Sequence, residues 1–312
     1  MRRRYRGLAI CGAEMTNDKI HGDRVNRRII ELSPDLSAGV SSEIEALAAM
    51  TTQLRKFAHT TSARQYWTEG ISEAPYQYES LLKLFPRGAK ILDVGVGLGQ
   101  SSVYLAERGY DVVAVEPSMV LCEIMRDAAA RHELPIQVVQ GVAENLSRLG
   151  RSDFDVVLFN ASLHHCDDPL LALAEAKSCL RKGGAVYLVN ETMLKPWQSE
   201  AVFQRRLKED PVAMGHYGGN EHAYHNGKYV RMLRSRFEDV EWLIPRAGSA
   251  LDDLRLLLNR HIDGTQIHTR NGAVLARFLF YIVRAWLRTV PWLYRVLARA
   301  SVVPVHFRAV KR

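Results

Sequence analysis

The chain has 312 residues, of which 47% are hydrophobic and 24% are charged. These values are ordinary for a globular protein with a real core, and they leave room for one large α/β domain with additions or for two small domains. The four cysteines are scattered without a C-x-x-C pair, which excludes a disulfide framework and favours a reducing, cytoplasmic location. The basic start of the chain has too short an apolar run for a signal peptide, and Met15 is an alternative start.

The formal net charge of +8 is concentrated at one end of the chain. Residues 273–312 contain eight arginines and lysines and no acidic residue, so the remaining residues sum to zero. The basic character is therefore a local feature.

The first segment, residues 1–40, is polar and irregular and predicts a loosely ordered arm. Residues 41–88 predict helices, the first from Ser41 to about Phe57 and the last from Tyr76 to Phe85. Between them, Tyr66 and Trp67 either cover a ligand or anchor a helix to the core.

Residues 89–118 predict a strand, a glycine turn, a helix and a second strand. Gly95, Gly97 and Gly99 follow the first strand at alternate positions, and glycines let a ligand lie against bare main chain. Glu116 ends the second strand, where a carboxylate accepts hydrogen bonds from both hydroxyls of a ribose. The segment predicts half of a nucleotide-binding βαβ unit.

The glycine spacing indicates which class of nucleoside cofactor the turn binds. A dinucleotide fingerprint is G-x-G-x-x-G, whereas this chain has G-x-G-x-G with Asp93 two residues before the first glycine. A carboxylate there repels a pyrophosphate but suits a cationic ligand with an α-amino group. The D-x-G-x-G-x-G pattern resembles motif I of the class I S-adenosylmethionine (SAM) methyltransferases, which favours SAM over NAD.

A second stretch supports this resemblance. The strand Phe154–Asn160 resembles motif IV of the family. It is followed by the sequence L-H-H, by D-P and a helix, and by R-K-G-G and a fifth strand. This order is similar to that of the small-molecule branch of the family. The turn at residues 141–145 is commonly G-D-A-E in the family, with the acid contacting adenine, but this chain has Val142 there. The resemblance implies adenine contacts from Ala143 and Glu144, whereas the alternative is a plain turn. The implied cofactor-binding residues are Asp93, Gly95, Gly97, Gly99, Glu116, Ala143, Glu144 and Asn160.

The resemblance runs from about Tyr66 to Ile244 and implies a Rossmann-like α/β fold. The expected sheet has seven strands, parallel except for the last, with helices on both sides. The predicted organisation begins with a loose N-terminal arm (residues 1–40) and N-terminal helices (41–88). A SAM-binding core (89–245) follows, then a helical insertion (246–303) and a final core strand (304–312).

Methyl transfer is an in-line displacement, and a hydroxyl acceptor needs a base that removes its proton. A histidine is the expected base, and the candidates are His164 and His165 after the fourth strand and His222 in a later loop. L-H-H is also common where its role is structural. Asn160 is followed by Ala-Ser-Leu rather than Pro-Pro-Tyr, which argues against the DNA and protein-amide N-methyltransferases. No metal site is predicted, because adjacent residues in H-H-C-D-D point apart.

Residues 273–300 predict a basic amphipathic helix that Pro291 kinks or divides. Its apolar run is too short to span a bilayer, but a one-sided arginine stripe suits a helix on anionic lipid. The alternatives are a helix packed on the sheet or on a dimer partner, and a nucleic-acid-binding surface. The stripe consists of Arg277, Arg284, Arg288, Arg295 and Arg299.

Together these observations predict a SAM-dependent methyltransferase acting on a hydroxyl of a small-molecule, glycan or lipid-linked acceptor, at the membrane surface. The alternatives are a catalytically silent scaffold with the same fold and an NAD(P)-dependent oxidoreductase. The sequence leaves the acceptor, its nucleophilic atom and the oligomeric state open.

Overall fold

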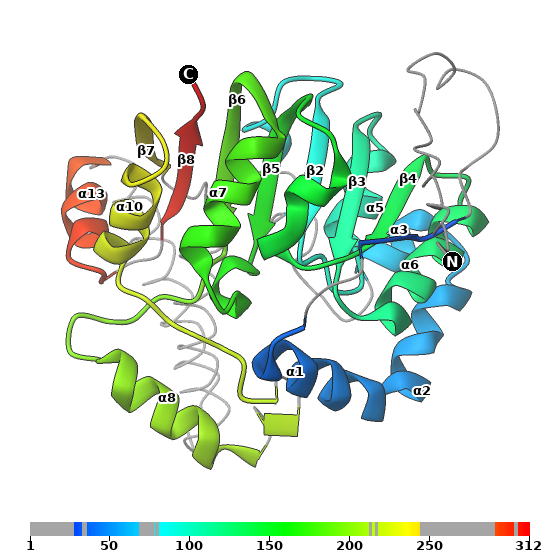
Figure 1. Ribbon diagram of the computed structural model, residues 1–312, viewed down its shortest axis with the longest axis horizontal. Coiled ribbons are helices and arrows are strands. Elements are labelled where there is room, and N and C mark those ends of the chain that lie inside the picture. Colours follow the sequence, from blue (N-terminus) through cyan, green and yellow to red (C-terminus); the bar gives the residue numbers. More distant parts are fainter. Residues whose placement is uncertain are drawn as a thin grey trace, which may run out of the picture.

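The computed structural model describes residues 28–32, 36–68, 78, 81–211, 214–215, 218–243, 291–302 and 305–312. Its centre is one eight-stranded sheet with the order β1-β4-β3-β2-β5-β6-β8-β7 and helices on both faces (Figure 1). The strands are β1 (Ile30–Glu31), β2 (Lys90–Val94), β3 (Asp111–Glu116), β4 (Ile136–Gln140), β5 (Phe154–Asn160), β6 (Leu180–Val189), β7 (Asp239–Leu243) and β8 (His306–Val310). Only β8 among these strands runs antiparallel to its neighbours, β6 and β7.

The predicted Rossmann-like sheet with one antiparallel strand is confirmed, but the predicted count of seven strands is one too few. The additional strand, β1, lies in the segment expected to be irregular and pairs parallel with β4 through Ile30 and Val139. Leu32 then donates its backbone N–H to Gln140 O and packs its buried side chain beside Gly141. Two residues are too few for a period-two pattern, so the sequence carried no sign of this strand.

The N-terminal helix also differs from its expected limits. It begins at Ala38 rather than Ser41, because Ser37 caps it by accepting the N–H of Val40. It then divides into three pieces before His59. The helices before the sheet are α1 (Ala38–Ala49), α2 (Thr51–Leu54), the 3₁₀ helix η1 (Arg55–His59) and α3 (Ala63–Thr68).

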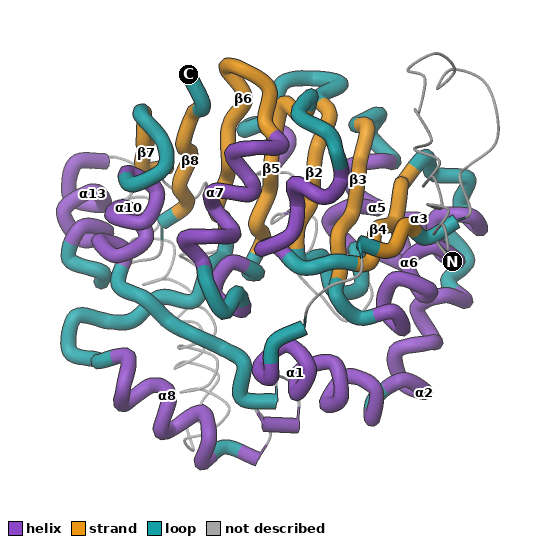
Figure 2. Tube along the Cα trace, in the orientation of Figure 1, coloured by secondary structure: helices purple, strands orange, loops and turns teal. Residues whose placement is uncertain are grey.

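Most of the remaining helices lie on the two faces of the sheet, whereas α8 lies beyond its carboxyl edge (Figure 2). They are α5 (Gln100–Ala106), α6 (Met119–Arg131), η2 (Ala143–Leu149), η3 (Leu163–His165), α7 (Pro169–Cys179), α8 (Glu200–Glu209), α10 (Asn226–Arg234) and α13 (Pro291–Arg299).

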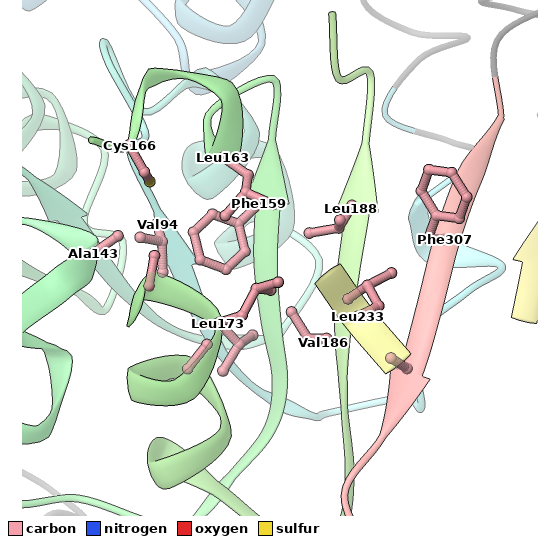
Figure 3. Packing of buried hydrophobic residues seen from close by; sticks show 14 of the residues in the cluster. Val94, Ala143, Phe159, Leu163, Cys166, Leu173, Val186, Leu188, Leu233 and Phe307 are labelled. Atoms are coloured by element: carbon pink, nitrogen blue, oxygen red, sulfur yellow. The ribbon is translucent and has the colours of Figure 1, made fainter. Parts of the chain in front are cut away.

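Two hydrophobic clusters form the core, one on each face of the sheet. Along β5, Val157 and Phe159 belong to one cluster while Val156 and Leu158 belong to the other. This alternation is the mark of a strand buried on both sides. In Figure 3, Leu173 of α7 and Leu233 of α10 lie over the first of these faces. The helices α3, α5 and α6 cover the second face.

The carboxyl ends of β2, β3, β5 and β6 meet at one edge of the sheet, which is where ligands bind in such folds. Both α1 and α8 lie along this edge (Figure 1). The hydroxyl of Ser42 donates to Gly218 O at 2.9 Å, which ties α1 to a loop more than 170 residues later. This edge is therefore covered by elements that precede β2 and by elements that follow β6 in the chain.

Most of the predicted helical insertion, including Arg277, Arg284 and Arg288, lies outside the described residues. Within the described part, α13 carries Arg295 and Arg299. No helix among the described residues is long and apolar enough to cross a membrane.

Candidate functional site

The glycine turn follows β2 with all three glycines in the left-handed region, at φ values of +67°, +56° and +69°. A Cβ on Gly95 would lie 2.7 Å from Ser162 Cβ, and one on Gly99 would collide with Met125. A Cβ on Gly97 would meet nothing within 4 Å. Two of the glycines therefore serve packing as well as backbone conformation, whereas Gly97 presents bare main chain to open space.

Asp93 lies one residue before the end of β2 and is 1% exposed. Its Oδ2 accepts hydrogen bonds from Ser101 and Ser102 at 3.0 and 2.7 Å. Among the described residues, Oδ1 has no partner. Burial raises the pKa of Asp93 to about 6, against the opposite effect of the two hydroxyls. A buried carboxylate oxygen without a partner is costly, and a cationic donor would relieve that cost.

Glu116 ends β3 and is 4% exposed. Its Oε2 accepts the N–H of Gly97 at 2.8 Å, and its Oε1 accepts the N–H of Ser118 at 3.0 Å. Burial raises the pKa of Glu116 to about 8, although both N–H groups lower it. The carboxylate thus lies against the glycine turn, where the sequence predicted it.

This raised pKa makes the stability of the ligand-free protein depend on pH. Glu116 takes up its proton more readily when folded than when unfolded, so its contribution favours folding below about pH 5 and is lost as the pH rises towards 8. We expect the free energy of unfolding to fall through this window by about 1 kcal/mol per pH unit. Urea titrations at several pH values should show a smaller slope for Glu116→Gln, and an equal slope would contradict this assignment.

The residues expected around adenine lie in η2 and just before it. Val142 and Ala143 are both buried, at 7% and 8% exposure. Glu144 accepts the N–H of Asp168 at 3.3 Å, and burial raises its pKa. Asn160, at the end of β5, accepts a hydrogen bond from the side chain of Asn190 at 2.8 Å. Their predicted contacts with a cofactor stay predictions.

The two adjacent histidines of η3 have different surroundings. His164 is 4% exposed, with Nδ1 2.7 Å from Glu191 Oε2 and Nε2 3.1 Å from the hydroxyl of Thr192. The Glu191 carboxylate also accepts the backbone N–H groups of Ser162, Leu163 and His164. Both ring nitrogens of His164 are thus engaged, and the pair with Glu191 holds the turn that packs against Gly95.

Replacing Glu191 by alanine is expected to destabilise the protein by about 3 kcal/mol or more, since three buried N–H groups and a histidine lose their acceptor. Urea denaturation measures this loss. Glu175→Ala is a matched control, because that more exposed carboxylate accepts a single backbone N–H among the described residues, that of Ser147. Equal effects of the two substitutions would contradict the role of Glu191.

His165 points to a different group of residues. Its Nδ1 lies 2.8 Å from Asn220 O and 3.4 Å from Glu43 Oε1 of α1. The side chain of Asn220 donates to Glu43 at 3.1 Å and to His165 O at 3.0 Å. Burial lowers the pKa of His165, but the hydrogen bond and charge of Glu43 outweigh burial and raise it. The backbone N–H of His165 donates to Ser162 O at 3.1 Å, and Ser162 packs against Gly95, so this group lies beside the glycine turn.

His222 completes the set of predicted histidines. Its backbone N–H donates to His164 O at 3.0 Å, and its Nδ1 accepts from the amide of Gln204 of α8 at 3.2 Å. Burial lowers its pKa. The structure therefore brings all three histidines to the same edge of the sheet. Among the described residues no group of histidine, cysteine, aspartate and glutamate has metal-binding geometry.

Sequence reasoning missed Glu43 and Glu191. The first was interpreted only as part of a helix start, and the second only as the end of a strand. Tyr66 and Trp67 turn out to be anchors, as one of the two interpretations held. Both are buried: Tyr66 donates to Leu98 O, and Trp67 donates to Glu107 at 2.9 Å.

Comparisons with known proteins agree with this geometry. Residues 92–188, from Leu92 of β2 through most of β6, match a family model described as a methyltransferase domain. Residues 92–188 of this chain are thus similar to a methyltransferase domain, the family that the D-x-G-x-G-x-G motif resembles. An uncharacterized methyltransferase of Mycobacterium tuberculosis is 38% identical over 119 residues, 38% of this chain and 46% of that protein.

Two other relatives match about a third of this chain. A ubiquinone biosynthesis O-methyltransferase of Haemophilus ducreyi is 31% identical over 112 residues, 34% of this chain and 48% of that protein. A tRNA 5-carboxymethoxyuridine methyltransferase of Escherichia coli is 29% identical over 111 residues, 35% of this chain and 42% of that protein. The chain thus spans less than half the length of these curated relatives.

Solved structures share the fold of the methyltransferase domain. The [4+2]-cyclase SpnF has a TM-score of 0.53 and 17% identity, covering 91% of this chain and 99% of that one. The phosphoethanolamine N-methyltransferase 2 of Haemonchus contortus has a TM-score of 0.51 and 16% identity, covering 83% of this chain and 60% of that one. At these identities the likeness concerns the fold alone.

Proposed function

We propose that this chain binds SAM at the carboxyl edge of the sheet and transfers its methyl group to a hydroxyl of a small-molecule, glycan or lipid-linked acceptor. The observation that carries the proposal is the glycine turn with a buried carboxylate on each side. Asp93 offers an oxygen that no described residue occupies, and Glu116 offers two oxygens beside bare main chain at Gly97. These features fit an α-amino group and a ribose.

Different residues would bind different groups of SAM. Asp93 would accept the ammonium group, and Glu116 would accept the two ribose hydroxyls. Val142 and Ala143 would supply apolar contact to the adenine. SAM, when bound, supplies a methyl group on a sulfonium, which a nucleophile can attack in line.

His165 is the residue best suited to act as the base. Its Nδ1 donates to the carbonyl of Asn220, which fixes the orientation of the ring and the tautomer with the proton on Nδ1. The Glu43 carboxylate then stabilises the ring after it has taken a proton. Since both ring nitrogens of His164 are engaged by Glu191 and Thr192, His164 is better suited to position the turn.

An oxygen acceptor is favoured because a hydroxyl must lose its proton as it attacks, and a histidine paired with a carboxylate serves that step. The similarity to an O-methyltransferase of ubiquinone biosynthesis supports the same choice. The test is incubation with methyl-labelled SAM and fractionated metabolite and lipid extracts, followed by mass spectrometry of the labelled product. We expect the label in an O-methyl group; label only on nitrogen or carbon would contradict the hydroxyl acceptor.

A further inference from the structure

Helix α13 exposes a face whose composition is unusual for a solvated surface. Trp292 and Val296 are 65% and 51% exposed, and Arg295 and Arg299 beside them are exposed as well. At about 100° per residue these four side chains fall within an arc of about 100°. The outward face therefore has Arg295 and Arg299 side by side next to Trp292 and Val296, and no acidic residue occurs anywhere in residues 273–312.

The opposite face of α13 fixes the helix to the core. Tyr294 and Ala298 are 3% and 1% exposed and belong to the hydrophobic cluster on that side of the sheet. Asn226 of α10 donates its side-chain amide to Ala298 O at 2.8 Å and its backbone N–H to the Ser301 hydroxyl at 2.9 Å. The outward face is thus held in a fixed orientation by the folded domain.

A second exposed tryptophan lies in a loop that contacts the chain just after α13. Trp197, in the loop between β6 and α8, is 77% exposed. In the same loop, Lys195 donates to Val302 O at 3.2 Å, directly after α13, and Val302 is itself exposed. Figure 1 shows this loop and α13 on one side of the sheet. We call the set formed by Trp197, Trp292, Arg295, Val296, Arg299 and Val302 the α13 surface.

We propose that the α13 surface docks the protein on an anionic lipid bilayer. Tryptophan is the side chain that favours the boundary between headgroups and acyl chains, and arginine binds lipid phosphate. The absence of acids from this end of the chain complements the negative charge of such a membrane. The loop that carries Trp197 also carries Thr192, whose hydroxyl lies 3.1 Å from His164 Nε2, so one loop links the docking surface to the candidate site.

The experiment is co-flotation of the full chain with vesicles in which about a third of the lipid is phosphatidylglycerol, compared with pure phosphatidylcholine. We expect binding to the anionic vesicles only, reduced by salt. The double variant Arg295→Glu with Arg299→Glu should weaken binding by at least about 20-fold. Trp197→Ser with Trp292→Ser should weaken it while leaving the salt dependence in place.

The matched control is Lys83→Glu with Arg87→Glu, which makes the same charge change at exposed residues. Their neighbours Leu81 and Phe85 belong to the hydrophobic cluster on the other face of the sheet, away from Tyr294. Equal losses in the two charge variants would overturn the proposal, as would absence of vesicle binding. Displacement of the vesicles by a duplex oligonucleotide, or loss of a dimer in the tryptophan variant, would also overturn it.

Vesicle binding is measured without cofactor, so the outcome is separate from that of the proposed methyl transfer. A chain that floats with vesicles but binds no S-adenosylhomocysteine would leave the docking surface in place and contradict only the proposed activity.

Discussion

Replacing Glu116 by alanine is expected to weaken the binding of S-adenosylhomocysteine by at least about 100-fold, as measured by titration calorimetry. Hydrogen bonds to a charged group contribute about 1.5–3 kcal/mol each, and this carboxylate would make two of them to the ribose. The product is the suitable probe because it contains the ribose and the α-amino group and is not consumed.

Glu116 also accepts two backbone N–H groups, so its replacement can affect the glycine turn itself. Glu116→Gln keeps an acceptor in place and should still weaken binding by at least about tenfold. Asp111→Ala, at the exposed start of the same strand, is the control and should bind as the wild type does. Wild-type affinity for S-adenosylhomocysteine in both Glu116 variants would show that this carboxylate does not bind the ligand.

Replacing His165 by glutamine is expected to lower kcat by about 10²–10⁴-fold while changing the affinity for S-adenosylhomocysteine only slightly, since general-base catalysis contributes about that much. The measurement is steady-state kinetics with the acceptor found by methyl labelling. His132→Gln is the control, because that histidine contacts Thr60 and not the site. Undiminished kcat in His165→Gln would exclude it as the base.

The partner of His165 gives a second readout. Glu43 raises the pKa of His165, and the base must be unprotonated to act, so the rate rises as the pH passes through that pKa. Glu43→Gln should lower the pKa and move this rising limb to lower pH, together with a loss of about tenfold in kcat. A purely structural role of Glu43 would lower activity without moving the limb.

The site residues that could be predicted from the sequence are those that lie close together in one short segment of the chain. Asp93, the three glycines and Glu116 occupy 24 consecutive residues of a βαβ unit, so their proximity follows from local structure alone. The strand at residues 154–160 begins and ends where the sequence predicted, because it is an apolar run bounded by clear turns.

The parts that were not predictable depend on contacts between distant segments. The sequence treats His164 and His165 as equivalent, and only the turn of η3 directs one ring to Glu191 and the other to Glu43. Glu43 reaches His165 because α1 is fastened to the loop of Gly218 and Asn220. Neither the hydrophobic periodicity nor a sequence motif predicts a contact between such distant residues.

The measurement that tests the central claim most directly is calorimetric titration of the purified chain with S-adenosylhomocysteine, with NADH as the control ligand. We expect saturable binding of S-adenosylhomocysteine and none of NADH, since the carboxylate of Asp93 beside the turn favours an ammonium group and disfavours a pyrophosphate. Binding of NADH, or of neither ligand, would contradict the proposed function.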